Sequence, residues 1–364
     1  METQPGGAVR VWNPAEGAWG EGEVWTLTED LWIGSMDDAG PALFGQVVAV
    51  EADPLGRVWV LERDAREVRV FGPDGRHVRT LGRRGAGPGE LADPIGFAWA
   101  PDGRLWVADP GNARFTVFDT AGRYVDSHPR RVGGYSMPWR GGFDAEGRLY
   151  EVAAVPRGAG HGPALLRYGP DLQPADTLPL PEVPSQQFEL KSPGGGMMAV
   201  SVPFAPGAAV AVDPRGFVWS GITDRVRLHQ QSLSGDTVRI VEREAAPVPV
   251  TAGDREKALE GLRWFTDQGG RVDPGRFPAH KPAFSGIYVA PDGHLWMRPS
   301  LPEGHAGAAF DLFDPEGRYL GRAGLPTGLA QSPPPVVRGD ALYGVRRDSL
   351  DVPYVVRVRI RRGG

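Results

Sequence analysis

The chain has no cysteine among its 364 residues. This absence excludes disulfide bonds, metal sites built from thiolates and cysteine nucleophiles, and it leaves the cellular compartment open. Lysine is also scarce, because only Lys191, Lys257 and Lys281 occur among 40 basic residues; this bias indicates a GC-rich genome rather than a function. No run approaches the roughly 18 consecutive apolar residues of a membrane-spanning helix, so we expect no transmembrane segment.

A strong excess of charge is missing as well. The formal net charge is −5 and the sequence pI is about 5.9, which argues against a general nucleic-acid-binding surface. The N-terminal stretch METQPGGAVRV has neither the basic segment nor the apolar core of a signal peptide. We expect a monomer that is periplasmic or extracellular with its signal removed; a cytoplasmic location stays open.

Turn residues, by contrast, are abundant and recur in a repeated sequence motif. Residues 100–125, APDGRLWVADPGNARFTVFDTAGRYV, contain two short apolar runs between glycine-containing turns, as strands and hairpins do. Similar stretches occur in six copies. Their marker glycines are separated by 47, 44, 69, 77 and 46 residues and are Gly56, Gly103, Gly147, Gly216, Gly293 and Gly339.

A repeat of about 45 residues with about four strands predicts the blade of a β-propeller. The strand-like segments are apolar on both faces, as required when blades cover one another around an axis. We therefore predict an all-β, six-bladed propeller of four-stranded blades, with residues 1–364 forming one domain. An all-β sandwich and a stack of separate domains are the alternatives. The last copy lacks a fourth strand, and the apolar residues 23–34 are expected to supply it and close the ring.

The second copy resembles an NHL repeat, and residues 40–81 match the same pattern less fully. The resemblance implies a six-bladed propeller like those of bacterial envelope proteins, most of which are binding platforms, although the group includes lyases and hydrolases. Fold resemblance alone does not choose among these functions. The matching residues are Gly85, Gly87, Gly89, Pro94, Gly96, Gly103, Val107, Asp109, Asn112, Arg114, Phe118 and Gly122. We expect Asp109, Asn112 and Arg114 to tie the loop after the second strand to its neighbour.

Propeller topology places the long insertions on one face. The loops between strands 2 and 3 and the connections between blades share that face, and residues 181–206 and 244–282 are long connections. Residues 251–270 predict a helix that begins after Thr251, a good N-cap, and ends at Gly269 and Gly270. The helix is expected to pack over the rim or to cover the site as a lid.

No nucleophile elbow, P-loop or dinucleotide fingerprint occurs. Calcium is disfavoured because Asp93 is the only acidic residue where the inner strands begin. Zinc is the better metal option, since His128, His161, His280 and His305 map to the face with the long loops. A zinc-dependent lyase or hydrolase using His161, His280 and His305 is therefore the alternative function.

The opening of the central channel on the face with the long loops is expected to be lined by aromatic and basic residues, which suits a small anion or an acidic peptide. We expect no catalytic residue and no required cofactor, so the leading prediction is a non-catalytic ligand- or protein-binding propeller. Two alternatives apply to individual residues: Trp139 could be core, and Arg83 and Arg84 could be solvated. The predicted ligand-binding residues are Arg84, Asp93, Trp139, Arg140, Phe204, His280 and Lys281.

Overall fold

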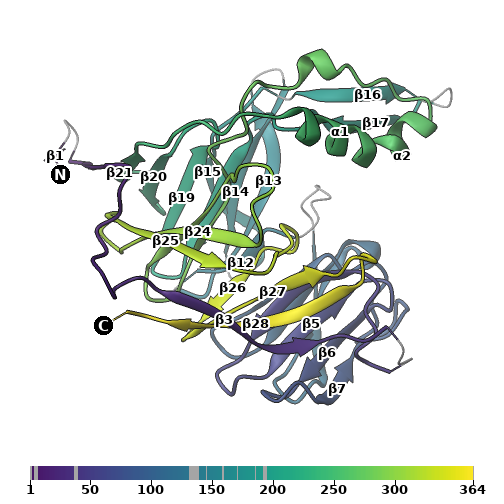
Figure 1. The fold of residues 1–364 in the computed structure, drawn as a ribbon. Helices are drawn as coiled ribbons and strands as arrows, with labels where there is room; N and C mark the ends of the chain where they lie inside the picture. Colours follow the sequence, from purple (N-terminus) through teal and green to yellow (C-terminus); the bar gives the residue numbers. More distant parts are fainter. Residues whose placement is uncertain are drawn as a thin grey trace.

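The computed structural model describes residues 2–3, 7–36, 40–130, 139–144, 146–157, 160–169, 171–184, 186–191 and 195–363. It confirms an all-β, six-bladed propeller of four-stranded blades (Figure 1). Blade 1 consists of β4 (Val47–Ala52), β5 (Val58–Glu62), β6 (Glu67–Phe71) and β7 (His77–Leu81). Blade 2 consists of β8 (Gly96–Trp99), β9 (Leu105–Asp109), β10 (Arg114–Phe118) and β11 (Tyr124–Pro129). Blade 3 consists of β12 (Gly141–Phe143), β13 (Leu149–Arg157), β14 (Gly160–Tyr168) and β15 (Pro174–Pro179). Blade 4 consists of β18 (Ala208–Asp213), β19 (Phe217–Ile222), β20 (Arg227–Ser232) and β21 (Thr237–Arg243). Blade 5 consists of β22 (Phe284–Val289), β23 (Leu295–Pro299), β24 (Ala308–Phe313) and β25 (Tyr319–Leu325). Blade 6 consists of β26 (Val336–Arg338), β27 (Ala341–Arg347), β28 (Pro353–Arg361) and β3 (Thr26–Ile33).

The marker glycines make the turn between the first two strands of each blade. Gly103, for example, adopts φ of 81°, which other residues rarely tolerate, and its N–H donates to the carbonyl of Ala100 at 2.9 Å. We call the side of the ring with these turns the turn face and the opposite side the loop face. The first, innermost strand of each blade therefore begins at the loop face and ends at the turn face.

The apolar core lies between neighbouring blades rather than inside a single layer. All five residues of β5 are buried, and Trp59 packs edge-on against Trp99 of blade 2 with ring centroids 4.8 Å apart. Because each sheet is covered on both sides, the double-faced apolar pattern of the sequence is explained.

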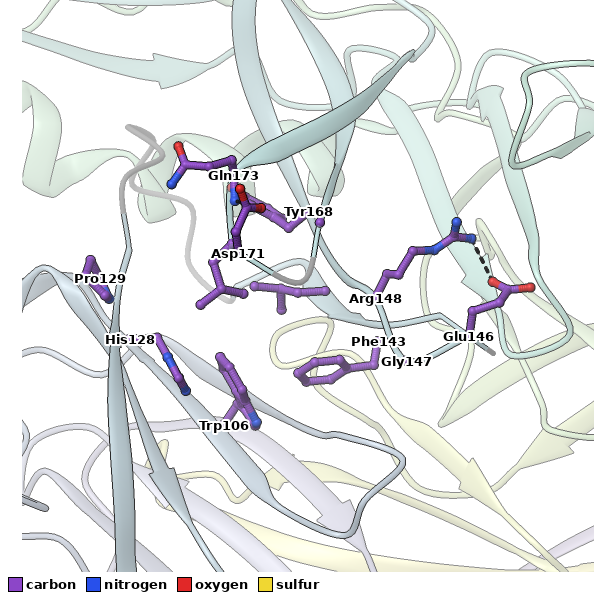
Figure 2. A pocket seen from close by; sticks show the side chains of 13 residues that line it. Trp106, His128, Pro129, Phe143, Glu146, Gly147, Arg148, Tyr168, Asp171 and Gln173 are labelled. Carbon is purple, nitrogen blue, oxygen red and sulfur yellow. Dashed lines mark hydrogen bonds and ion pairs between the residues drawn. The ribbon is translucent and has the colours of Figure 1, made fainter.

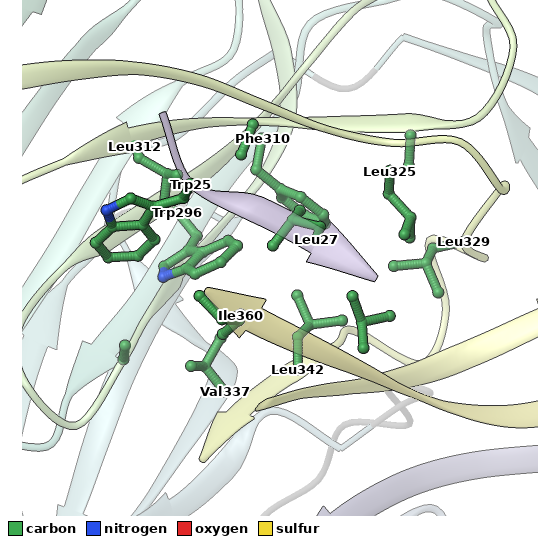
Figure 3. Packing of buried hydrophobic residues seen from close by; sticks show 14 of the residues in the cluster. Trp25, Leu27, Trp296, Phe310, Leu312, Leu325, Leu329, Val337, Leu342 and Ile360 are labelled. Atoms are coloured by element: carbon green, nitrogen blue, oxygen red, sulfur yellow. The ribbon is translucent and has the colours of Figure 1, made fainter. Parts of the chain in front are cut away.

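The N-terminal strand closes the ring, as predicted. β3 pairs antiparallel with β28 in the last blade and becomes its fourth strand. Trp25 and Leu27 are buried beside Trp296 and Phe310 of blade 5 (Figure 3). Closure therefore satisfies the edge of β28 and covers the apolar face between blades 5 and 6.

One N-terminal feature was not expected. β2 (Val9–Asn13) pairs in parallel with β21, the outer strand of blade 4, and β1 (Glu2–Thr3) pairs with β2. Asn13 holds this addition in place, because its amide donates to the carbonyl of Gly317 at 3.0 Å and accepts from the N–H of Tyr319 at 2.8 Å. Blade 4 therefore belongs to a six-stranded sheet.

The two long insertions pack against each other. Residues 181–206 hold the hairpin of β16 (Gln187–Lys191) and β17 (Met197–Ser201). Residues 244–282 hold α1 (Ala252–Gly261) and α2 (Arg263–Asp267), the two α-helices of the described residues, and Figure 1 shows them beside the hairpin.

Thr251 starts α1 in a capping box with Asp254, as predicted, but the helix breaks at Leu262 instead of running to Gly269. Leu262 and Phe265 are buried with the hairpin's Phe188, so the helices pack on the other insertion. No described helix is long and apolar enough to cross a membrane. The assignment of residues 1–364 to a single domain stays a prediction.

Candidate functional site

Trp139 precedes β12 and lies buried between blades 2 and 3, with 7% of its surface exposed. Its indole Nε1 donates a hydrogen bond to Glu151 Oε1 at 2.5 Å, and its ring lies 5.6 Å from that of Phe115. These contacts make Trp139 a packing residue, the alternative noted above, rather than a lining residue of the channel mouth.

Lys281 does not contribute a free charge to the mouth, which corrects the sequence-based expectation. Its Nζ donates to Asp254 Oδ1 at 2.8 Å and to the carbonyl of Leu301 at 3.1 Å, and the side chain is mostly buried. Asp254 therefore neutralises Lys281. This pair could not be predicted from the sequence, because Asp254 lies 27 residues earlier, on the inserted helix α1.

Two other predicted site residues are also engaged in structural contacts. Asp93 accepts from Arg63, with the closest guanidinium nitrogen 2.8 Å away. Phe204, with φ of 63°, packs its ring 6.1 Å from that of Phe277 in the cluster of the two insertions. Neither residue is therefore presented to a ligand as the sequence suggested.

The remaining predicted residues lie on exposed segments. Arg84 is exposed and forms a backbone bridge with Leu91, whereas its neighbour Arg83 pairs with Glu90 at 2.8 Å. His280 is exposed in a backbone bridge with Pro249. Both Arg84 and His280 therefore lie on the surface in contact with solvent, which for Arg84 is the alternative noted above.

The histidines proposed as zinc ligands come from separate places. His161 is exposed on β14, His305 is exposed in the loop after β23, and His128 stacks on Trp106 with ring centroids 4.6 Å apart. Within the described ranges, no group of three or more histidine, aspartate or glutamate side chains is placed to hold a metal ion.

Arg140 is the one predicted residue that the structure connects to the channel. It lies just before β12 at the loop face, and its side chain is exposed. Its positive charge acts on the phenol of Tyr288 in β22. Blades 3 and 5 are not neighbours in the ring, so this interaction passes across the central channel.

Arg298, at the end of β23, completes what we call the channel group: Arg140, Tyr288 and Arg298. Its guanidinium donates to the carbonyls of Leu329 and Ala330, and its charge acts on the phenol of Tyr288. Burial lowers the pKa of Arg298. Burial also raises the pKa of Tyr288, although the charges of Arg298 and Arg140 oppose that rise. The tyrosine therefore stays protonated at neutral pH.

Neither arginine of the channel group forms an ion pair with a carboxylate of the described residues. One half-buried and one exposed guanidinium thus lie at the channel, and Arg298 donates its hydrogen bonds to backbone carbonyl oxygens. Such a pair of cations without counter-charge is electrostatically costly, and an anion would offset that cost.

The sequence analysis missed Arg298, although the repeat contained a signal. The fifth residue after each marker glycine occupies the same place in the second strand of its blade. Five copies have an apolar residue or glycine there, and only the fifth copy has a charge. The six residues are Leu61, Ala108, Val152, Gly221, Arg298 and Gly344.

A second polar group lies near the turn-face end of the channel. Arg338, the last residue of β26, pairs with Glu51 of β4 at 2.5 Å, and its charge also acts on the phenol of Tyr150 in blade 3. Unlike the channel group, this cluster contains its own carboxylate and is neutral.

The residues of the NHL-like pattern form the expected tie in blade 2. Asp109 accepts from the backbone N–H groups of Ala92 and Asp93, and Asn112 donates to Asp109 at 2.7 Å and to the carbonyl of Gly85 at 2.9 Å. Arg114 donates to the carbonyls of Gly87 and Glu90. These bonds join the loop after β9 to the connection that precedes the blade.

No family model and no curated protein matches the chain, so the resemblance to NHL repeats stays a prediction. Solved structures do match it. A putative exported protein from Bacteroides fragilis is 12% identical with a TM-score of 0.56, and the match covers 97% of this chain and 100% of that one. A member of the duf4221 family from Bacteroides vulgatus is 9% identical with a TM-score of 0.51, covering 94% and 99%. The PQQ-bound aldose sugar dehydrogenase from Streptomyces coelicolor is 13% identical with a TM-score of 0.48, covering 93% and 99%. The first two matches show a similarity in fold alone, and at these identities the similarity assigns no activity.

Proposed function

We propose that this protein is a non-catalytic binding propeller that holds a small anion, or the acidic group of a peptide, at the loop-face mouth of its channel. One observation supports the proposal above all: Arg140 and Arg298 come from different blades, both act on Tyr288, and neither pairs with a described carboxylate. Arg298 thus takes the place that the sequence analysis assigned to Lys281 as a second positive charge beside Arg140.

The chemistry of these groups favours carboxylate or phosphate. A guanidinium offers two parallel N–H donors that match the oxygens of either group. Tyr288 retains its proton at neutral pH, so its O–H can donate to a bound anion. Arg298 is half-buried and held by backbone carbonyls, whereas Arg140 is exposed and able to close over the ligand.

The proposal is tested by titrating inorganic phosphate and succinate into the protein in a calorimeter. Arg140→Ala should weaken binding by more than about tenfold, or roughly 1.4 kcal/mol, while the melting temperature stays nearly unchanged. Arg271→Ala is the matched control, because Arg271 is an equally exposed arginine on the insertion. Equal affinities of the wild type and Arg140→Ala would contradict the anion site. Stoichiometric zinc in the purified, tag-free protein would instead favour the lyase or hydrolase alternative.

A further inference from the structure

A cavity of about 450 Å³ lies between blades 2 and 3, away from the channel group (Figure 2). This volume falls within the range of small-molecule sites. Figure 2 shows Trp106, His128 and Phe143 along one side of the cavity, with Tyr168 and Asp171 opposite. Four of its lining residues therefore carry an aromatic ring.

The other blade junctions show why this cavity is unusual. In blades 1, 2 and 5 the turn between strands 3 and 4 packs a glycine against an aliphatic side chain on the outer strand of the preceding blade, whereas Asp351, with φ of 64°, occupies this place in blade 6. A Cβ built on Gly122 would lie 2.9 Å from Leu81, and one built on Gly317 would lie 2.5 Å from Val241. Gly75 lies in the same way against Leu31. At these glycines the turn lies directly against the neighbouring strand.

Both sides of the junction between blades 2 and 3 depart from this arrangement. Leu172 occupies the place of the turn glycine, with φ of 56° and its N–H bonded to the carbonyl of Gly169, as Gly122 bonds to Asp119. On the facing strand, His128 occupies the register of Leu81. The junction between blades 2 and 3 carries both changes, and the residues at both changed positions line the cavity.

The changed residues form an aromatic wall. The His128 ring stacks on Trp106 with centroids 4.6 Å apart and planes 8° apart, and Phe143 meets Trp106 at 5.4 Å and 71°. A flat ring stacked or set edge-on against such a wall gains both buried area and favourable quadrupole contact.

The rim of the cavity is acidic. Glu146 and Asp171 are exposed there. Arg148 does not offset both, because its guanidinium is held by Asp144 at 2.8 Å and by Glu146 at 2.8 Å. Asp171 forms no ion pair with the residues that the structure describes. A ligand with a positive charge would therefore be favoured at this rim and over the face of Trp106.

We propose that the cavity between blades 2 and 3 is a second binding site, for a small molecule that combines a planar aromatic ring with a positive charge. The ring packs between Trp106 and Tyr168, and the cation lies near Asp171. This site is independent of the channel group, which attracts the opposite charge.

Calorimetry with three small probes tests the class of ligand. Tryptamine carries both features, indole-3-propionate keeps the ring with a negative charge, and cyclohexylamine keeps the charge without an aromatic ring. The wild type should bind tryptamine at least about tenfold more tightly than either of the others. Equal binding of the three probes, or no binding of tryptamine, overturns the proposal.

Two variants locate the site. The double substitution His128→Leu with Leu172→Gly removes the ring that stacks on Trp106 and a second lining side chain, so it should strongly weaken tryptamine binding. Asp171→Asn keeps the turn's hydrogen-bond acceptor and removes the charge, so it should weaken tryptamine about threefold. Asp74→Asn is the matched control, because Asp74 accepts from Arg76 in blade 1 as Asp171 accepts from Gln173, both at 3.1 Å.

Retained affinity in the double variant, or an equal effect of Asp171→Asn and Asp74→Asn, would place tryptamine elsewhere and overturn the assignment. Arg140→Ala should leave tryptamine binding unchanged, so failure of this proposal and failure of the anion site are distinguishable.

Discussion

Lys281 and Asp254 form an ion pair at 2.8 Å that joins the entry to blade 5 to the first turn of α1. Asp254 is also the third residue of that helix and accepts from Thr251 in the capping box. One carboxylate therefore caps the inserted helix and anchors it to the propeller. The charge that the sequence suggested for a ligand instead positions the insertion.

Lys281→Met should therefore destabilise the protein by about 2 kcal/mol, as expected for a charge-assisted hydrogen bond lost from a mostly buried site. Lys257→Met is the matched control, because Lys257 is 74% exposed and lies 3.7 Å from Glu303, so its loss should cost less than about 0.5 kcal/mol. Urea denaturation measures both. Phosphate affinity should be unchanged in Lys281→Met; a loss of affinity would return Lys281 to the anion site.

The ion pair of Lys281 and Asp254 also predicts how the stability of the protein changes at acid pH. Burial raises the pKa of Asp254, but the hydrogen bonds from Lys281 and Thr251 outweigh it and the net pKa lies below the ordinary value. The stabilisation is therefore complete above the unfolded pKa of about 3.9 and is lost as the pH falls through the lower folded pKa. Lys281→Met should lose less stability than the wild type over this acid range. Identical acid profiles would contradict this role for the pair.

Ring closure predicts a severe effect of truncation. Removing residues 1–34 exposes the edge of β28 and the apolar face covered by Trp25 and Leu27. The truncated protein should melt at a markedly lower temperature or aggregate during size-exclusion chromatography. Removing residues 1–7 deletes only β1 and should leave the melting temperature nearly unchanged. Equal melting of both truncations would contradict closure by β3.

The repeat explains how much the sequence could predict. Glycine spacing and two-faced strands depend on local rules, so the blades, the loop face and the closing strand followed from them. Side-chain partners depend on which loops meet in space. The pairing of Asp254 with Lys281 and that of β2 with blade 4 could not be predicted, because the segments that carry Asp254 and β2 are not part of the repeat. Arg298 and Leu172 were accessible from the sequence as residues that break the register of their copies, had each position been compared across the blades.

The tie in blade 2 predicts a modest loss of stability. Asn112→Ala removes the donor to Gly85 and to Asp109, and we expect a cost of about 1 kcal/mol in chemical denaturation. Phosphate and tryptamine affinities should stay at the wild-type values. Weaker binding with unchanged stability would assign Asn112 to a ligand site instead of the blade.

The pair of Glu51 and Arg338 predicts the opposite pH response to that of Asp254. Burial raises the pKa of Glu51, and the charge of Arg338 only partly opposes this rise. The folded protein therefore binds this proton more tightly than the unfolded chain, so stability falls as the pH rises from the unfolded pKa of about 4.3 through the folded pKa.

Arg338→Met removes the opposing charge, raises the pKa of Glu51 further and leaves a desolvated carboxylate without its ion-pair partner at neutral pH. Because Arg338 is 40% exposed, we expect a cost of about 2 kcal/mol, between the values for surface and buried pairs. Melting temperatures at about pH 5 and about pH 8 should differ more in Arg338→Met than in the wild type, with the variant recovering at the lower pH. Adding Glu51→Gln should restore much of the stability and remove this extra pH dependence. An equal loss at both pH values, or no recovery in the double variant, would show that Arg338 stabilises the channel through packing rather than through its charge on Glu51.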